Sequence, residues 1–165
     1  MSFTKKDLPI NVDEIKGFLA DDEGEALFSA ALETANLGPC LEVGSYCGKS
    51  TVYLGAACQQ QNGIVYAIDH HRGSEEHQLG EEYHDSDLFD AQAQLMDTFK
   101  EFRRVMREAK LEDTVIPIVA ASKLASTNWS TPLGMVFIDG GHSLDAAMAD
   151  YRAWATHVSV GGILA

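Results

Sequence analysis

Short apolar runs alternate with longer amphipathic stretches along this chain, and this alternation most strongly limits how it can fold. Apolar runs at 40–43, 64–68, 115–119 and 135–138 predict strands, and a fifth strand is expected to begin at 163–165. Between these runs, apolar residues recur every three or four positions, which is the period of a helix. Strands that alternate with helices predict βαβ units. We therefore predict an α/β fold with a doubly wound, mostly parallel sheet and helices on both faces.

The spacing of apolar residues also predicts where the helices lie. We expect helices over 12–19, over about 27–35 with a stop at Gly38-Pro39, from Gly48 to about Gln60, over 88–109, and from a cap at Ser143 to about Ala155. The stretch 70–86 is dense in His, Glu, Gly and Asp and almost lacks apolar residues, so it is expected to form an exposed loop.

A chain of 165 residues, 45% of them apolar, is long enough to bury one core, and we predict a single domain over 1–165. The last apolar run continues to Ala165. We therefore expect C-terminal strands of this domain to lie beyond that residue. Cys40, Cys47 and Cys58 form no CxxC pair, and we expect them to be buried and unpaired.

The formal net charge is −13, and this acidity argues against several classes of partner. Binding to nucleic acid requires a basic surface, and an anionic membrane would also repel the chain. We expect no signal peptide, because residues 1–10 contain Lys5, Lys6 and Asp7 and no apolar run, and we expect no membrane-spanning segment, because no apolar stretch is long enough. We expect a cytoplasmic protein with a small-molecule partner, without nucleic acid or membrane, and the sequence leaves a homo-oligomer open.

A glycine-rich turn, Gly44-Ser45-Tyr46-Cys47-Gly48, connects the first predicted strand to a helix. In doubly wound folds the carboxyl ends of the strands bind ligands. A dinucleotide fold requires G-x-G-x-x-G and a P-loop requires G-x-x-x-x-G-K-[ST]. This chain has G-x-x-x-G followed by Lys49-Ser50, so a P-loop-like nucleotide hydrolase remains an alternative.

Two acidic residues favour a cationic ligand that carries no phosphate. Glu42 stands at the foot of the turn, where a carboxylate would repel phosphates. S-adenosylmethionine has no phosphate and carries an ammonium and a sulfonium group. Asp69 ends the second strand about 20 residues after Gly48, the spacing at which a carboxylate accepts hydrogen bonds from a ribose diol.

The same residues carry a resemblance to a known family. Glu42-x-Gly44-x-x-x-Gly48 resembles motif I of class I S-adenosylmethionine-dependent methyltransferases, and the segment 41–50, with its Tyr-Cys-Gly, is similar to the catechol O-methyltransferase group. Ala120-Ala121-Ser122 resembles that group's adenine-contacting segment, and 135–139 resembles its metal-binding strand end. Asp139-Gly140-Gly141-His142 also resembles bacterial small-molecule methyltransferases and cephalosporin-hydroxylase-like proteins. The resemblance covers roughly 25–165.

This resemblance implies a Rossmann-like methyltransferase fold with S-adenosylmethionine as the cofactor. Gly44, Ser45 and Tyr46 are expected to line its methionine end, Ser50 to bind its carboxylate, Asp69 to bind the ribose and Ser122 to bind the adenine. Glu42, Gly48 and His70 adjoin these residues and complete the expected cofactor site.

The resemblance also implies how the chemistry is carried out. Asp139 would be a ligand of Mg²⁺ or another divalent cation, and His142 stands where the catechol enzymes have a catalytic lysine. A cation lowers the pKa of a bound hydroxyl, and a histidine can remove its proton near neutral pH. We expect methyl transfer to the hydroxyl oxygen of a small molecule, with Asp139 and His142 as catalytic residues. A non-catalytic cofactor-binding module is the second alternative.

Overall fold

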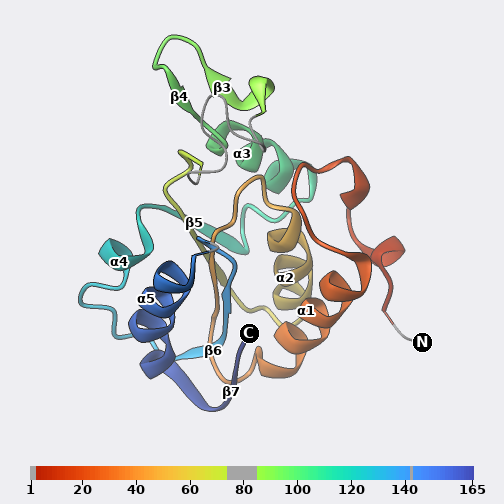
Figure 1. Cartoon of the computed structure of the whole chain (residues 1–165). Coiled ribbons are helices and arrows are strands. Elements are labelled where there is room, and N and C mark those ends of the chain that lie inside the picture. Colours follow the sequence, from red (N-terminus) through yellow and green to blue (C-terminus); the bar gives the residue numbers. More distant parts are fainter. Residues whose placement is uncertain (1–2, 74–84, 142) are drawn as a thin grey trace.

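A five-stranded parallel sheet forms the centre of the computed structural model, which describes residues 3–73, 85–141 and 143–165 (Figure 1). The strand order is β5-β2-β1-β6-β7, and every pairing is parallel. The strands are β1 (Cys40–Val43), β2 (Val65–Asp69), β5 (Val115–Val119), β6 (Leu133–Ile138) and β7 (Val158–Leu164). The predicted doubly wound α/β fold is confirmed, although the fifth strand begins at Val158 rather than at Ile163.

Helices cover both faces of this sheet, as predicted. α1 (Asp21–Thr34) and α2 (Lys49–Gln60) pack together on one face, and α4 (Ser122–Ala125) and α5 (Leu144–Trp154) lie on the other (Figure 1). Two hydrophobic clusters fill the spaces between these layers, the larger under α1 and α2 and the smaller around Trp154. The side chain of Ser143 accepts a hydrogen bond from the Ala146 amide and caps α5, which confirms that predicted start.

The helix predicted over 88–109 is wrong in its first half. A 3₁₀ turn, η4 (Ser86–Leu88), leads into an antiparallel hairpin of β3 (Phe89–Asp90) and β4 (Leu95–Met96), and α3 occupies only Phe99–Glu108. The Asp90 carboxylate accepts hydrogen bonds from the amides of Gln92 and Ala93, which favours a turn over a helix. The Asp97 carboxylate accepts from the Phe99 amide, so a new helix begins there.

The helix predicted over 12–19 is also wrong. Only the 3₁₀ turn η2 (Val12–Glu14) forms there, preceded by η1 (Lys5–Asp7), and another short turn, η5 (Ala155–His157), follows α5. The three cysteines are buried and free, as expected. In the part of the chain that the structure describes, no helix is both long and apolar enough to cross a membrane.

Candidate functional site

A cavity of about 560 Å³ opens at the carboxyl edge of the sheet. It lies where the strand order reverses between β1 and β6, which is where doubly wound folds bind their ligands. Its walls are the segments that follow β1, β2, β5 and β6, the start of α2, one side of α5, and residues 16–19. Its volume lies within the range of small-molecule and cofactor sites.

The glycine-rich turn forms the floor of this cavity, and its two glycines have different tasks. Gly44 has a φ of +91°, and a Cβ there would lie 2.2 Å from the carbonyl oxygen of Asp139. Gly48 has a φ of +93° and precedes α2, but a Cβ on it would meet Met106 and Phe102 of α3. Gly44 therefore lines the cavity as predicted, whereas Gly48 faces the protein interior and lies outside its wall.

Asp69 is held in the cavity from two sides. Its Oδ2 accepts a hydrogen bond of 2.8 Å from the Tyr46 amide, and its Oδ1 accepts one of 2.7 Å from the His71 amide. Both donors are non-glycine residues with positive φ, 44° for Tyr46 and 58° for His71. Backbone strain of this kind is typical of functional sites. A carboxylate has about four lone-pair positions, so each oxygen of Asp69 can still accept a hydrogen bond from a ligand.

Glu42 lies beneath the turn rather than in the cavity wall, because its side chain is fully buried. The hydroxyls of Ser50 and Thr51 donate to its two oxygens at 2.5 Å each. Burial raises the pKa of this carboxyl to about 7, although the two hydroxyl donors oppose the shift. Ser50 does line the cavity as predicted, but its hydroxyl proton is directed to Glu42.

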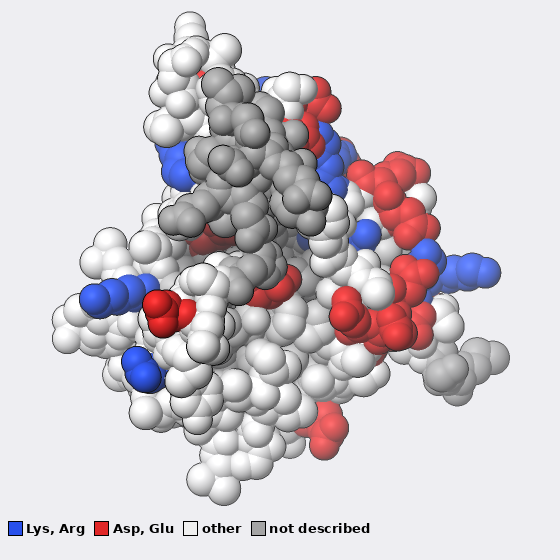
Figure 2. Space-filling view, viewed as in Figure 1, with Lys and Arg blue, Asp and Glu red and all other residues white. Residues whose placement is uncertain are grey.

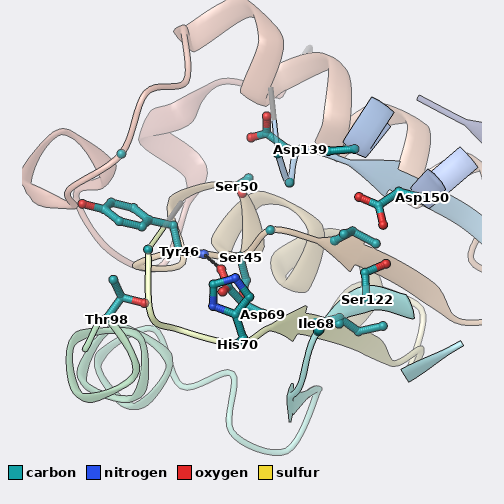
Figure 3. A pocket seen from close by; sticks show the side chains of 18 of the residues that line it. Ser45, Tyr46, Ser50, Ile68, Asp69, His70, Thr98, Ser122, Asp139 and Asp150 are labelled. Atoms are coloured by element: carbon teal, nitrogen blue, oxygen red, sulfur yellow. Dashed lines mark hydrogen bonds between the residues drawn. The ribbon is translucent and has the colours of Figure 1, made fainter. Parts of the chain in front are cut away.

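Ser45 is the polar residue of the turn that lacks a partner among the described residues. It lines the cavity, is 1% exposed, and its hydroxyl makes no hydrogen bond. Tyr46 and His70 line the cavity as well, and the Nδ1 atom of His70 accepts from the Arg72 amide. Figure 3 shows Ser45, Tyr46, His70 and Asp69 close together in the cavity.

The wall opposite the turn is built by the segment after β5 and by α5. Ser122 lines the cavity as predicted, and its Oγ accepts a hydrogen bond of 2.8 Å from the indole Nε1 of Trp154. Asp150, one helical turn before Trp154, also lines the cavity. Asp150 could not be found from the sequence, because helical periodicity identifies inward-facing apolar residues and gives no signal for an inward-facing carboxylate.

Asp139 lines the cavity at the end of β6, and its amide donates to the Val43 carbonyl. His142, the predicted base, lies outside the described residues. Within 3–73, 85–141 and 143–165, no group of three or more His, Cys, Asp or Glu side chains could hold a metal ion. Asp139 therefore lies in the cavity wall, and its role as a metal ligand stays a prediction.

Two further segments of the cavity wall went unnoticed in the sequence. Residues 16–19 lie along the cavity, and the Lys16 ammonium is paired with Asp85 at 2.6 Å and with Asp87 at 3.0 Å. Thr98 also lines the cavity, and its Oγ1 lies 2.7 Å from Nδ1 of the buried His71. Their partners are tens of residues distant in sequence, so no local pattern could indicate them.

Comparison with known proteins agrees with this geometry. A family model described as a methyltransferase domain matches residues 41–165, which begin in β1 and include the glycine-rich turn, Asp69, Ser122 and Asp139. This match confirms the resemblance to S-adenosylmethionine-dependent methyltransferases that the sequence motifs suggested.

Solved structures share the fold at low sequence identity. A Staphylococcus aureus protein provisionally described as a caffeoyl-CoA O-methyltransferase is 12% identical, with a TM-score of 0.62 over 93% of this chain and 59% of that one. The Podospora anserina methyltransferase PaMTH1, bound to SAH, is 12% identical, with a TM-score of 0.60 over 89% of this chain and 52% of that one. The O-methyltransferase TomG of Streptomyces achromogenes, in complex with SAM, is 17% identical, with a TM-score of 0.58 over 86% and 52%. This chain thus spans about half to three fifths of the length of these proteins, which share its Rossmann-like fold.

Proposed function

The chain belongs to the family of methyltransferase domains, and from that premise we propose that it transfers the methyl group of S-adenosylmethionine to the hydroxyl oxygen of a small molecule. The observation that carries this proposal is Asp69, held by two backbone amides at the edge of a cavity of cofactor size. Its remaining lone pairs suit the two hydroxyls of a ribose. Asp139 and Asp150 line the same cavity and favour a cationic ligand.

The glycine-rich turn disfavours the alternative of a P-loop nucleotide hydrolase. A phosphate loop directs its backbone N–H groups at the phosphates. Here the Gly44 amide donates to the Ile68 carbonyl, the Tyr46 amide to Asp69, and the Gly48 amide to the Ser45 carbonyl. These three amides are engaged within the protein and are not directed at a ligand.

Methyl transfer from a sulfonium is an in-line displacement, and the protein contributes mainly by holding the two reacting atoms in position. The acceptor hydroxyl must also lose its proton. We assign this step to Asp139, at the end of β6 in the cavity wall, together with His142, which lies outside the described residues. Among the described residues no group of three or more His, Cys, Asp or Glu side chains could hold a divalent cation, and the proton transfer is assigned to the protein's own side chains.

A small acceptor is consistent with the net charge of −13, which disfavours nucleic acid and anionic membranes as partners. Solved structures described as O-methyltransferases share this fold, and we infer that oxygen is the atom that is methylated. A cytoplasmic location and a single domain over 1–165 belong to the same proposal.

Calorimetric titration with S-adenosylmethionine tests the proposal directly. We expect the unaltered chain to bind it, and Asp69→Ala to bind it at least about tenfold more weakly, because lost hydrogen bonds between hydroxyls and a carboxylate cost about 1.5–3 kcal/mol. Asp145→Ala, at an exposed position in the first turn of α5, is the matched control and should bind normally. Binding of magnesium adenosine triphosphate in place of S-adenosylmethionine would contradict the proposal and support the nucleotide hydrolase.

A non-catalytic binding module would bind the cofactor equally well, so a second measurement is needed. We expect the chain to release S-adenosylhomocysteine slowly in the presence of an accepted hydroxyl compound, and Asp139→Asn to abolish that release while cofactor binding persists. Failure of the unaltered chain to release S-adenosylhomocysteine, while it still binds S-adenosylmethionine, would favour the binding module.

A further inference from the structure

We propose that Asp150 recognises the exocyclic amino group of the cofactor's adenine and thereby selects adenosine over the corresponding 6-oxo nucleoside. This inference rests on the proposed function, because it concerns the same cavity and the same cofactor. It assigns a specificity role to a residue that neither the sequence motifs nor the resemblance identified.

The position of Asp150 follows from the geometry of α5. Ala146, Asp150 and Trp154 are spaced four residues apart and therefore lie on one face of the helix. Trp154 is fully buried and its indole donates to Ser122 Oγ, which fixes this face against the segment that follows β5. Ala146 and Asp150 lie on the same face nearer the start of α5, and both line the cavity. Figure 3 shows the Asp150 carboxylate on the same side of the cavity as Ser122.

The carboxylate of Asp150 has lone pairs available for a ligand. No hydrogen bond or ion pair involves it within the described part of the chain, whereas both oxygens of Asp69 already accept backbone amides. Gly140 lies beside it, and a Cβ at that position would come within 3.2 Å of Asp150 Oδ2. An ionised carboxylate accepts hydrogen bonds and donates none, so the group it selects must be a donor.

The placement of Asp69 decides which part of the cofactor reaches Asp150. The ribose lies between the two ends of S-adenosylmethionine, and its proposed partner, Asp69, lies at the end of β2. The methionine carboxylate suits the start of α2, where helix N–H groups are unpaired. The base is then directed to the other end of the cavity, where Ile68, Ala121 and Ser122 present a largely apolar wall suited to a flat ring. The amino group of adenine is the donor that such a ring brings to Asp150.

The substitution of an oxygen for that amino group gives a direct test. S-inosylhomocysteine differs from S-adenosylhomocysteine in that its base presents an acceptor at this position, which would face the acceptor oxygens of Asp150. A site that pairs with a donor rejects the analogue that lacks it. We expect the unaltered chain to bind S-adenosylhomocysteine at least about tenfold more tightly than the inosyl compound in calorimetric titrations.

Asp150→Asn should reduce this preference to about threefold or less, because the amide can donate to the 6-oxo group. Asp150→Ala should reduce it as well, and it supplies the same test should the asparagine variant fold poorly. Asp145→Asn is the matched control on the same helix, since this exposed residue lies outside the cavity wall, and it should keep the full preference.

The inference is overturned if Asp150→Asn and Asp150→Ala keep the preference of the unaltered chain. If both ligands are also weakened equally, Asp150 lies against the methionine ammonium that they share. Failure of the unaltered chain to bind either ligand would instead remove the proposed function, and this inference with it.

Discussion

Gly44 and Gly161 have nearly the same backbone conformation, with φ values of +91° and +85°, but their surroundings differ. A Cβ at Gly44 would meet the Asp139 carbonyl oxygen at 2.2 Å, whereas at Gly161 the nearest atom is a Leu37 methyl at 3.7 Å. We expect Gly44→Ala to lower the free energy of unfolding by about 3–5 kcal/mol, from backbone strain and overpacking together. Gly161→Ala should lose only about 1–2 kcal/mol, from strain alone.

Urea denaturation of the two variants checks this difference. Equal losses would show that the close approach of β1 and β6 at the floor of the cavity relaxes easily, and that Gly44 is needed only for its conformation. A larger loss at Gly44 would show that the glycine of the turn is required by packing, even without a bound cofactor.

Glu42 is expected to destabilise the fold as the pH rises. Burial raises its pKa from 4.5 to about 7, so the folded state holds this proton more tightly than the unfolded chain does. Its contribution to stability is therefore greatest below pH 4.5 and is lost as the pH rises through about 7. Relative to the unaltered chain, Glu42→Gln should gain about 2–3 kcal/mol of stability between about pH 5 and pH 8.

Denaturation at several pH values measures this gain, with Glu112→Gln as the control because Glu112 is exposed. Parallel stability curves for Glu42→Gln and the unaltered chain would mean that the Ser50 and Thr51 hydroxyls keep the buried carboxylate ionised over the whole range.

For single residues, the sequence predicted where a residue lies along the sheet edge better than it predicted which other side chains that residue contacts. The spacing of Glu42, Gly44 and Asp69 follows from one strand–turn–helix unit, and chain order alone brings them to the same sheet edge. The Ser50–Glu42 hydrogen bond and the inward direction of Asp150 depend on which side of a helix meets the sheet. Packing decides that, and motif spacing does not record it.

Among the elements, the end of β2 and the start of α3 are connected by contacts between His71, which follows β2, and Thr98, which precedes α3. The Thr98 amide donates to the His71 carbonyl at 3.2 Å, and Thr98 Oγ1 lies 2.7 Å from His71 Nδ1. The His71 ring packs against Phe99 and Phe102 of α3. The His71 amide also donates to the Asp69 carboxylate. The contact between His71 and Thr98 therefore helps to position the proposed ribose site.

Thr98→Val removes the side-chain hydrogen bond while it keeps the shape of the residue. We expect a loss of about 1–2 kcal/mol, because a buried ring nitrogen is left unpaired. We also expect the variant to exchange its amide hydrogens faster than the unaltered chain does, with a larger increase at His71 and in the β3–β4 hairpin than in β1 and β2. Thr127→Val is the control, since Thr127 is exposed and its hydroxyl donates to the Lys123 carbonyl; that variant should change stability by no more than about 0.5 kcal/mol. Uniform changes in exchange over the whole sheet would contradict a local role for Thr98.

The segment from β2 to α3 shows why element prediction failed where it did. Leu88, Leu95 and Phe99 fit one helical stripe in the sequence, but Leu88 is buried and Leu95, in β4, is exposed. Carboxylates that cap turns, Asp90 and Asp97, interrupt the pattern. The parallel strands were predicted well because burial on both faces makes each one a short continuous apolar run.

For the whole molecule, the dominant electrostatic feature is its excess of acidic residues. The formal net charge is −13, and Figure 2 shows Asp and Glu side chains gathered over α1 and the turns that precede it. Several lysines and arginines are already paired, among them Lys5 with Asp13 and Asp21, and Arg104 with Glu101 and Glu108. The potential around the cavity is therefore expected to be negative and to attract cations.

This negative potential should strengthen the binding of S-adenosylmethionine more than that of S-adenosylhomocysteine. S-adenosylmethionine carries one positive charge more than S-adenosylhomocysteine, which is the sulfonium, and otherwise presents the same adenosine and methionine groups. We expect the Kd of S-adenosylmethionine to rise about threefold to tenfold from about 0.1 M to about 1 M salt, over which the Debye length falls from about 10 Å to about 3 Å. The Kd of S-adenosylhomocysteine, the natural control, should change less than about twofold. Parallel salt dependences in calorimetric titrations would mean that the sulfonium is read only by contacts within the cavity, and that the acidic surface serves another purpose.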